Sequence, residues 1–129
     1  MSDQQIIDCS GSYQTQGCSG GSRKGAMDFA KEKGLATQAS YPYVGTVQSC
    51  KVASGSLKFS SYSNTTGCDG IATALRKSPL SIAADASNWK PYRSGVFTNC
   101  GTTVTHDVLL VGQTTNYWKI KNSWGLSWG

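Results

Sequence analysis

Residues 104–112 read VTHDVLLVG, and residues 118–122 read WKIKN. Both stretches alternate at a period of two, which predicts two β-strands with one buried face each. The single histidine of the chain, His106, lies in the first strand, and Asn122 ends the second, sixteen positions later. If the two strands are antiparallel neighbours, these side chains can come within hydrogen-bond distance.

A histidine beside an asparagine has a chemical use. A neutral imidazole carries one donor nitrogen and one acceptor nitrogen. An asparagine oxygen bonded to the donor fixes the ring and leaves the other nitrogen for proton transfer, as needed beside a cysteine or serine nucleophile. The same pair also fits a structural histidine that is simply hydrogen-bonded. The two strands alone do not decide between these interpretations.

A helix is predicted over residues 22–33. Its apolar side chains share one side at three-to-four spacing, and Gly34 follows where a C-terminal cap favours positive φ. Residues 1–13 are polar apart from one apolar pair, and no helix is predicted there. Asp69 is expected to cap a second short helix, which Pro79 ends.

Residues 80–85 alternate again and predict a further strand before the two described above. Helices therefore come first and an antiparallel sheet later, which is the order of an α+β fold. The chain shows no internal repeat and no low-complexity tract. We expect one domain over residues 1–129.

The composition narrows the classes of function. The net charge is +5, but the twelve lysines and arginines are scattered, so we expect no nucleic-acid partner. No stretch approaches the ~18 apolar residues of a membrane span, so we expect no membrane partner either. Five cysteines without a CxxC pair, with one histidine, argue against a metal site, and we expect no cofactor. Residues 64–66, Asn-Thr-Thr, form an N-glycosylation sequon, a pattern that also occurs by chance.

Six segments in order cover nearly the whole chain and resemble motifs of papain-like cysteine peptidases of the cathepsin type. They read SDQQIIDC at 2–9, CSGG at 18–21, YPY at 41–43, YRSGVF at 92–97, VTHDVLLVG at 104–112 and KNSWGLSWG at 121–129. Chance does not readily supply six such motifs in one order. The resemblance implies a partial papain-like fold, with a helical part over about 1–66 and an antiparallel β-sheet part over about 67–129.

The resemblance also assigns roles to residues. It implies that His106 is the general base and acid, that Asn122 orients it, and that Trp124 shields the pair from water. Gly20 and Gly21 match a stretch whose backbone pairs with the extended substrate, although any tight turn also favours glycine.

Three further positions belong to the implied substrate-binding set, namely Thr105, Arg23 and Ala83. Ser22 and Arg23 replace the apolar pair that lines the pocket for the second substrate residue in the family. Together with the small side chain of Ala83, this leads us to expect a wider pocket that tolerates polar or acidic side chains. Arg23 pointing to solvent is the alternative.

One departure from the family concerns the nucleophile. The Cys-Gly-Ser-Cys-Trp segment that supplies the family's thiol matches nothing in the chain. We therefore expect a middle piece of a longer protein, or a truncated product. The first hypothesis is a cysteine endopeptidase represented by its histidine and asparagine. The alternative is an inactive relative that binds peptides or a protein partner.

The resemblance implies a disulfide between Cys9 and Cys50. Cys18 and Cys100 match cysteines whose family partners lie outside this sequence, and Cys68 has no counterpart. Expected partners are peptide or protein substrates, with protein inhibitors or a propeptide as further candidates. A disulfide suits an oxidising compartment, so we expect the secretory pathway, ending in a lysosome, a vacuole or the extracellular space.

Overall fold

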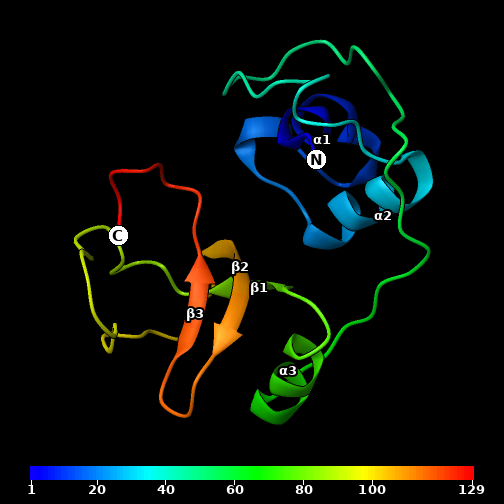
Figure 1. Ribbon diagram of the computed structural model, residues 1–129. Coiled ribbons are helices and arrows are strands. Elements are labelled where there is room, and N and C mark those ends of the chain that lie inside the picture. The colour runs from blue at the N-terminus through cyan, green and yellow to red at the C-terminus, as the bar shows by residue number, and fades with distance from the viewer. The chain divides into compact units, whose positions relative to one another are not determined.

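The computed structural model describes all residues from 1 to 129 and divides them into two units, Met1–Ser63 and Asn64–Gly129. The first unit holds α1 (Asp3–Cys9), the 3-10 turns η1 (Gly11–Tyr13) and η2 (Gly17–Ser19), and α2 (Arg23–Lys33). The second unit holds α3 (Cys68–Leu75) and the strands β1 (Leu80–Ala84), β2 (His106–Gln113) and β3 (Trp118–Lys121) (Figure 1). None of the helices combines the length and the apolar character that crossing a membrane requires.

Helix α2 begins one residue later than the sequence predicts and ends at Lys33, as predicted. The Ser22 hydroxyl accepts a hydrogen bond from a backbone N–H of the first turn, which caps the helix. Gly34 follows the last residue with a φ of 77°, a conformation that glycine adopts without steric penalty. Phe29 and Ala30 on the apolar face form the core of this unit with Leu35.

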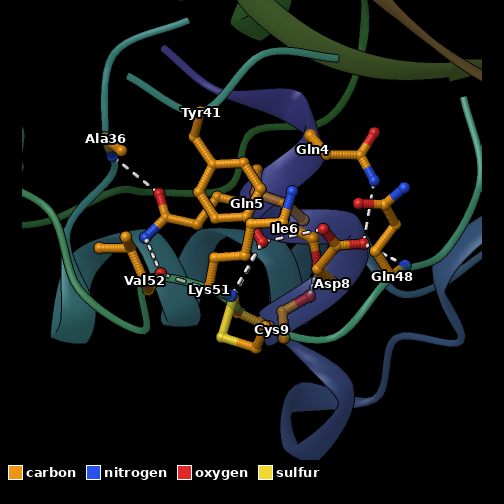
Figure 2. Close-up of a disulfide and its surroundings, with 12 residues drawn as sticks. Gln4, Gln5, Ile6, Asp8, Cys9, Ala36, Tyr41, Gln48, Lys51 and Val52 are labelled. Carbon is orange, nitrogen blue, oxygen red and sulfur yellow. Dashed lines mark hydrogen bonds between the residues drawn. A yellow bond between two sulfur atoms is a disulfide. The ribbon is translucent and has the colours of Figure 1, made fainter. Parts of the chain in front are cut away.

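Helix α1 was not predicted, because its buried face is polar. Gln4 is 1% exposed and Gln5 is 0% exposed. The side chain of Gln5 accepts a hydrogen bond from the Ala36 N–H at 2.7 Å and donates to the Val52 carbonyl at 3.0 Å (Figure 2). A buried amide is tolerated when its groups are paired in this way. The glutamine thereby holds two distant loop segments against α1.

A second set of polar contacts centres on Asp8. Its carboxylate accepts hydrogen bonds from the Gln4 amide at 2.9 Å, the Tyr41 hydroxyl at 2.8 Å and the Gln48 N–H at 2.8 Å (Figure 2). Burial alone raises the pKa of Asp8, but the hydrogen bonds from Gln48, Tyr41 and Gln4 outweigh it and lower this pKa below its ordinary value.

The predicted disulfide between Cys9 and Cys50 is present and joins the last residue of α1 to the segment that the glutamines bind. Its cysteines are 41 residues apart, and closing a loop of this length is worth about 4 kcal/mol in the chain-entropy account. The remaining cysteines, Cys18, Cys68 and Cys100, are free and exposed.

Helix α3 differs from the prediction at its start. Asp69 does not cap it, because Gly67 precedes the helix with a φ of 74° and no side chain makes a capping hydrogen bond. Asp69 lies instead in the first turn, where a carboxylate still interacts favourably with the helix dipole. The helix ends at Leu75, before Pro79, as expected.

The sheet of the second unit is antiparallel, in the order β1-β2-β3. Val108 and Leu110 of β2 are buried, and they alternate with exposed residues, as the period of two predicts. The strand begins at His106, two residues later than the pattern suggested. The predicted α+β class, with helices and an antiparallel sheet, is confirmed.

Replacing Gln5 with methionine is expected to lower the free energy of unfolding by about 2 kcal/mol or more. Methionine has a similar length but leaves the Ala36 N–H and the Val52 carbonyl unpaired, and each such group costs about 1–3 kcal/mol. Denaturant unfolding followed by circular dichroism measures the loss. Gln38→Met, at an exposed turn position, is the matched control. Equal unfolding free energies for the two variants would contradict the role of Gln5.

The contacts of Asp8 predict a loss of stability in acid. Because the folded-state pKa is lowered, their contribution is fully present above the ordinary aspartate pKa of about 3.9 and is lost as the pH falls through the folded pKa. The unfolding free energy of Asp8→Asn should therefore depend less on pH than that of the wild type in this acidic range. Denaturant titrations at a series of pH values test this, with Asp3→Asn as the control. A wild-type pH slope in Asp8→Asn would show that the carboxylate contributes nothing.

Candidate active site

The register between β2 and β3 places His106 and Asn122 on one face of the sheet. Leu109 pairs with Lys121, so the next residue, Asn122, falls across from Val108, and His106 is its diagonal neighbour on the same face. The two side chains meet, with 2.8 Å between His106 Nε2 and Asn122 Oδ1. The contact that the sequence predicted is therefore made.

The backbone of Ser123 determines which ring nitrogen carries the proton. Its N–H lies 2.8 Å from Asn122 Oδ1, and a backbone N–H can only donate. The atom that faces His106 is therefore the acceptor oxygen of the amide, and Nε2 must be the donor. In the neutral ring Nδ1 then holds the lone pair, so Nδ1 is the atom that can accept a proton.

Two indole rings border the histidine. Trp124 stacks on the His106 ring, with centroids 5.1 Å apart and an interplanar angle of 30°. Trp89 meets the same ring edge-on, with centroids 6.4 Å apart and an angle of 83°. The two indoles also contact each other, at 6.5 Å. These rings give the imidazole an apolar border, and the shielding role of Trp124 stays a prediction.

Trp89 is a neighbour of His106 that the sequence did not predict. It lies in the loop that follows β1, where no periodic pattern marks a residue as important. The only available sign was the presence of four tryptophans, two of them in the motif around Asn122. Trp128 from that motif donates its indole N–H to the Trp89 carbonyl at 3.0 Å, which holds the loop beside the histidine.

Thr105 fixes the start of β2. Its N–H donates to the Ala84 carbonyl at 3.0 Å, and its hydroxyl accepts from the Ala86 N–H at 3.0 Å. Thr105 was expected to bind substrate. In the structure its hydroxyl bonds to the Ala86 backbone and so holds Thr105, the residue before His106, in place. A role of Thr105 in substrate binding stays a prediction.

Asp85 holds the loop that leads into β2. Its carboxylate accepts hydrogen bonds from the Ser87 N–H at 3.0 Å and from the Thr103 N–H at 2.9 Å. Hydrogen bonds from Ser87 and from the Thr103 N–H lower the pKa of Asp85, so the carboxylate that anchors this loop is ionised at neutral pH. The polypeptide is thus tied down on both sides of the turn before His106.

The predicted glycine pair lies in the first unit. Two backbone hydrogen bonds flank it, from the Gln16 N–H to the Gly20 carbonyl at 2.8 Å and from the Ser22 N–H to the Gln14 carbonyl at 3.0 Å. Thr15 and Gly21 are therefore a non-hydrogen-bonded antiparallel pair, in which the N–H and C=O of Gly21 point away from Thr15. A Cβ at Gly21 would lie 3.0 Å from the Thr15 Cα. Gly21 thus offers an exposed backbone edge to which an extended peptide can pair.

The two residues expected to shape specificity have different surroundings. Ala83 pairs with Asp107, so alternation puts it on the strand face opposite to that of His106. Arg23 is the first residue of α2 and is exposed. Their part in substrate selection stays a prediction.

The sequence profile described as "Papain family cysteine protease" matches residues 1–129. This chain belongs to the papain family. Cathepsin L 2 of Paramecium tetraurelia is 39% identical over 132 residues, which cover 100% of this chain and 42% of the relative. Vignain of Phaseolus vulgaris is 36% identical over 143 residues, which cover 100% of this chain and 39% of the relative. The chain thus spans 42% and 39% of the length of these curated relatives.

Solved structures of papain-family proteases agree in fold. The Carica candamarcensis cysteine protease CMS1MS2, in complex with E-64, has a TM-score of 0.92 at 29% identity, over 99% of this chain and 63% of that one. Digestive procathepsin L 3 of Tenebrio molitor has a TM-score of 0.85 at 30% identity, over 99% of this chain and 46% of that one. The papain-like fold predicted from the six motifs is confirmed.

Thr105→Val is expected to lower the free energy of unfolding by about 1–3 kcal/mol, because valine keeps the side-chain shape and leaves the N–H of buried Ala86 unpaired. Thr105→Ser keeps a hydroxyl and is the conservative control, which should stay closer to the wild type. Denaturant unfolding of the three proteins gives the comparison. If valine and serine destabilise equally, the hydrogen bond to Ala86 is not what matters at this position.

Proposed function

We propose that the protein carrying these residues is a cysteine-type endopeptidase that hydrolyses peptide bonds through a Cys-His-Asn mechanism. The observation that supports it is the double hydrogen bond on Asn122 Oδ1, from the Ser123 N–H and from His106 Nε2. This arrangement holds the imidazole in one orientation and leaves Nδ1 as the base. Membership of the papain family supports a peptidase at the family level.

In the proposed reaction, Nδ1 of His106 takes the proton of a thiol, and the thiolate attacks the carbonyl carbon of the peptide bond. The imidazolium then gives its proton to the leaving amine, and a thioester remains. Water hydrolyses the thioester while Nδ1 again accepts a proton, which is returned to the thiol as the acid product leaves. Asn122 keeps the ring in place through both halves of the reaction.

None of the five cysteines fits the role of that thiol. The disulfide removes two of them, and the other three are exposed thiols outside any Cys-Trp context, namely Cys18, Cys68 and Cys100. The hydrogen bond and the ring contacts of His106 are with Asn122, Trp89 and Trp124. We therefore propose that the nucleophile is a residue outside 1–129. Since a general base contributes about 10²–10⁴-fold only when a nucleophile is within reach, residues 1–129 alone should be inactive.

The exposed edge of Gly21 supports a peptide substrate. An extended chain that pairs with its N–H and C=O would be held by main-chain hydrogen bonds, which tolerate many side chains. The same edge supports a second candidate function, a peptide-binding module without catalysis, because the pairing needs no thiol. Turnover separates the two functions, since a binding module would retain the peptide uncleaved.

The disulfide supports a location in an oxidising compartment, and we propose the secretory route, with a lysosome, a vacuole or the cell exterior as destination. Two matched proteases, from Carica candamarcensis and Ananas comosus, were solved with E-64 bound. Others were solved as a precursor or in a proform. We propose inhibitors of that type and a propeptide as partners of this protein as well.

Asn122→Ala is expected to lower kcat/KM by about 10–150-fold in the protein that includes the flanking sequence. This range corresponds to the about 1.5–3 kcal/mol of a hydrogen bond to a charged group, here the imidazolium. His106→Ala should remove activity by a larger factor, because proton transfer itself is lost. A fluorogenic dipeptide assay with and without a thiol-alkylating reagent gives both numbers. Asn116→Ala, at the turn between β2 and β3, is the matched control and should keep wild-type turnover.

Alkylation that leaves turnover intact would rule out cysteine chemistry. Wild-type turnover in His106→Ala would rule out the base. Peptide binding without any turnover in the wild type, with a thiol present beside His106, would favour the binding module instead.

A further inference from the structure

The sequon at residues 64–66 is a feature that peptide hydrolysis does not use. Asn64 is one of five asparagines in the chain, and it alone is followed two positions later by serine or threonine. The other four are followed at that position by lysine, glycine or tryptophan. A glycan attached to residues 1–129 through an asparagine would therefore have a single acceptor.

The structure places this sequon in an accessible segment. Asn64, Thr65 and Thr66 are all exposed, and residues 61–66 contain no helix, strand or turn. Asn64 is also the first residue of the second unit, so the sequon follows directly on the end of the first. A glycosyltransferase needs an acceptor segment that fits its own binding site, and sequons in surface loops meet this need.

One contact before the sequon and one within it anchor the segment and leave the acceptor exposed. Before the sequon, the Tyr62 hydroxyl donates to Asp28 of α2 at 2.7 Å. Within it, the Thr65 hydroxyl lies against Gly70 of α3, where an added Cβ would come within 2.6 Å of it. The middle residue therefore packs on the helix that follows, while Asn64 and Thr66, the two residues that a transferase reads, remain exposed.

We propose that Asn64 is an N-glycosylation site, whose donor is a lipid-linked oligosaccharide diphosphate. The Asn64 Nδ2 forms a bond to C1 of the first sugar, and the bond from C1 to the phosphate oxygen breaks. The lipid diphosphate leaves, and the amide gives up one proton to the transferase. The hydroxyl of Thr66 is the recognition element. This inference rests on the proposed secretory route, but not on the proposed peptidase activity.

The test expresses the full protein, flanking sequence included, behind a cleavable secretory leader in eukaryotic cells. Peptide N-glycosidase converts a glycosylated asparagine to aspartate, and mass spectrometry of the tryptic peptide 59–76, between Lys58 and Arg76, locates the change. We expect conversion at Asn64 and a gel-mobility shift of one glycan, both lost in Asn64→Gln and Thr66→Ala. Thr66→Ser and Thr65→Ala keep the sequon and should keep the glycan.

Two outcomes would overturn the proposal. One is a secreted protein with an intact Cys9–Cys50 disulfide and an unmodified peptide 59–76. The other is loss of the glycan in Thr65→Ala as well as in Thr66→Ala. Because the leader is added, this experiment tests the acceptor site separately from the natural route. The location of the protein expressed with its own flanking sequence alone tests that route. Dipeptide turnover, measured on the same preparations, tests the peptidase proposal independently of the glycan.

Discussion

The pairing register of β2 with β3 is the constraint on which the candidate active site depends. Side chains alternate along a strand, so a slip of one residue would move Asn122 to the opposite face and separate it from His106. The half-buried Ile120 of β3 opposes such a slip, since it would turn outward together with Asn122 and leave its partner, the buried Leu110 of β2. The packing of a few apolar side chains thereby fixes the position of two polar side chains. Strand packing brings the two side chains of the site together, and hydrogen bonding then orients them.

Hydrogen bonds then orient the Asn122 amide and the His106 ring. Asn122 Oδ1 accepts from both the Ser123 N–H and His106 Nε2, which uses both lone pairs of the oxygen. The Nδ2 of the same amide is buried and makes no hydrogen bond within residues 1–129. The orientation of the amide is therefore set by strand geometry and by the two hydrogen bonds that its oxygen accepts.

The sequence predicted the elements that show a periodic pattern of apolar residues. It did not predict features that depend on contacts between residues far apart in the chain. The period of α2, with Gly34 after it, gave its extent to within one residue, and alternation gave the three strands. Helix α1 escaped notice because its buried face carries Gln4 and Gln5, which composition rules assign to the surface. One readable sign existed, since Ser2 followed by a glutamine at the third helical position matches a capping box, and Ser2 does cap the helix. Trp89 offered no local pattern, because its ring contacts arise only when its loop folds back.

In both units, polar groups that hold the structure keep their charge state in mild acid, which bears on the proposed compartment. In the first unit the contacts of α1 include the ionised carboxylate of Asp8, and its lowered pKa keeps that carboxylate charged in mildly acidic surroundings such as a lysosome or vacuole. In the second unit the group that orients His106 is a neutral amide, which does not titrate at any pH that a folded protein experiences. A carboxylate in the place of Asn122 would be a second titratable group beside the imidazole, whereas the amide carries no charge. With asparagine, the ring is held in the same orientation whether or not Nδ1 carries a proton, because Nε2 is a donor in both states.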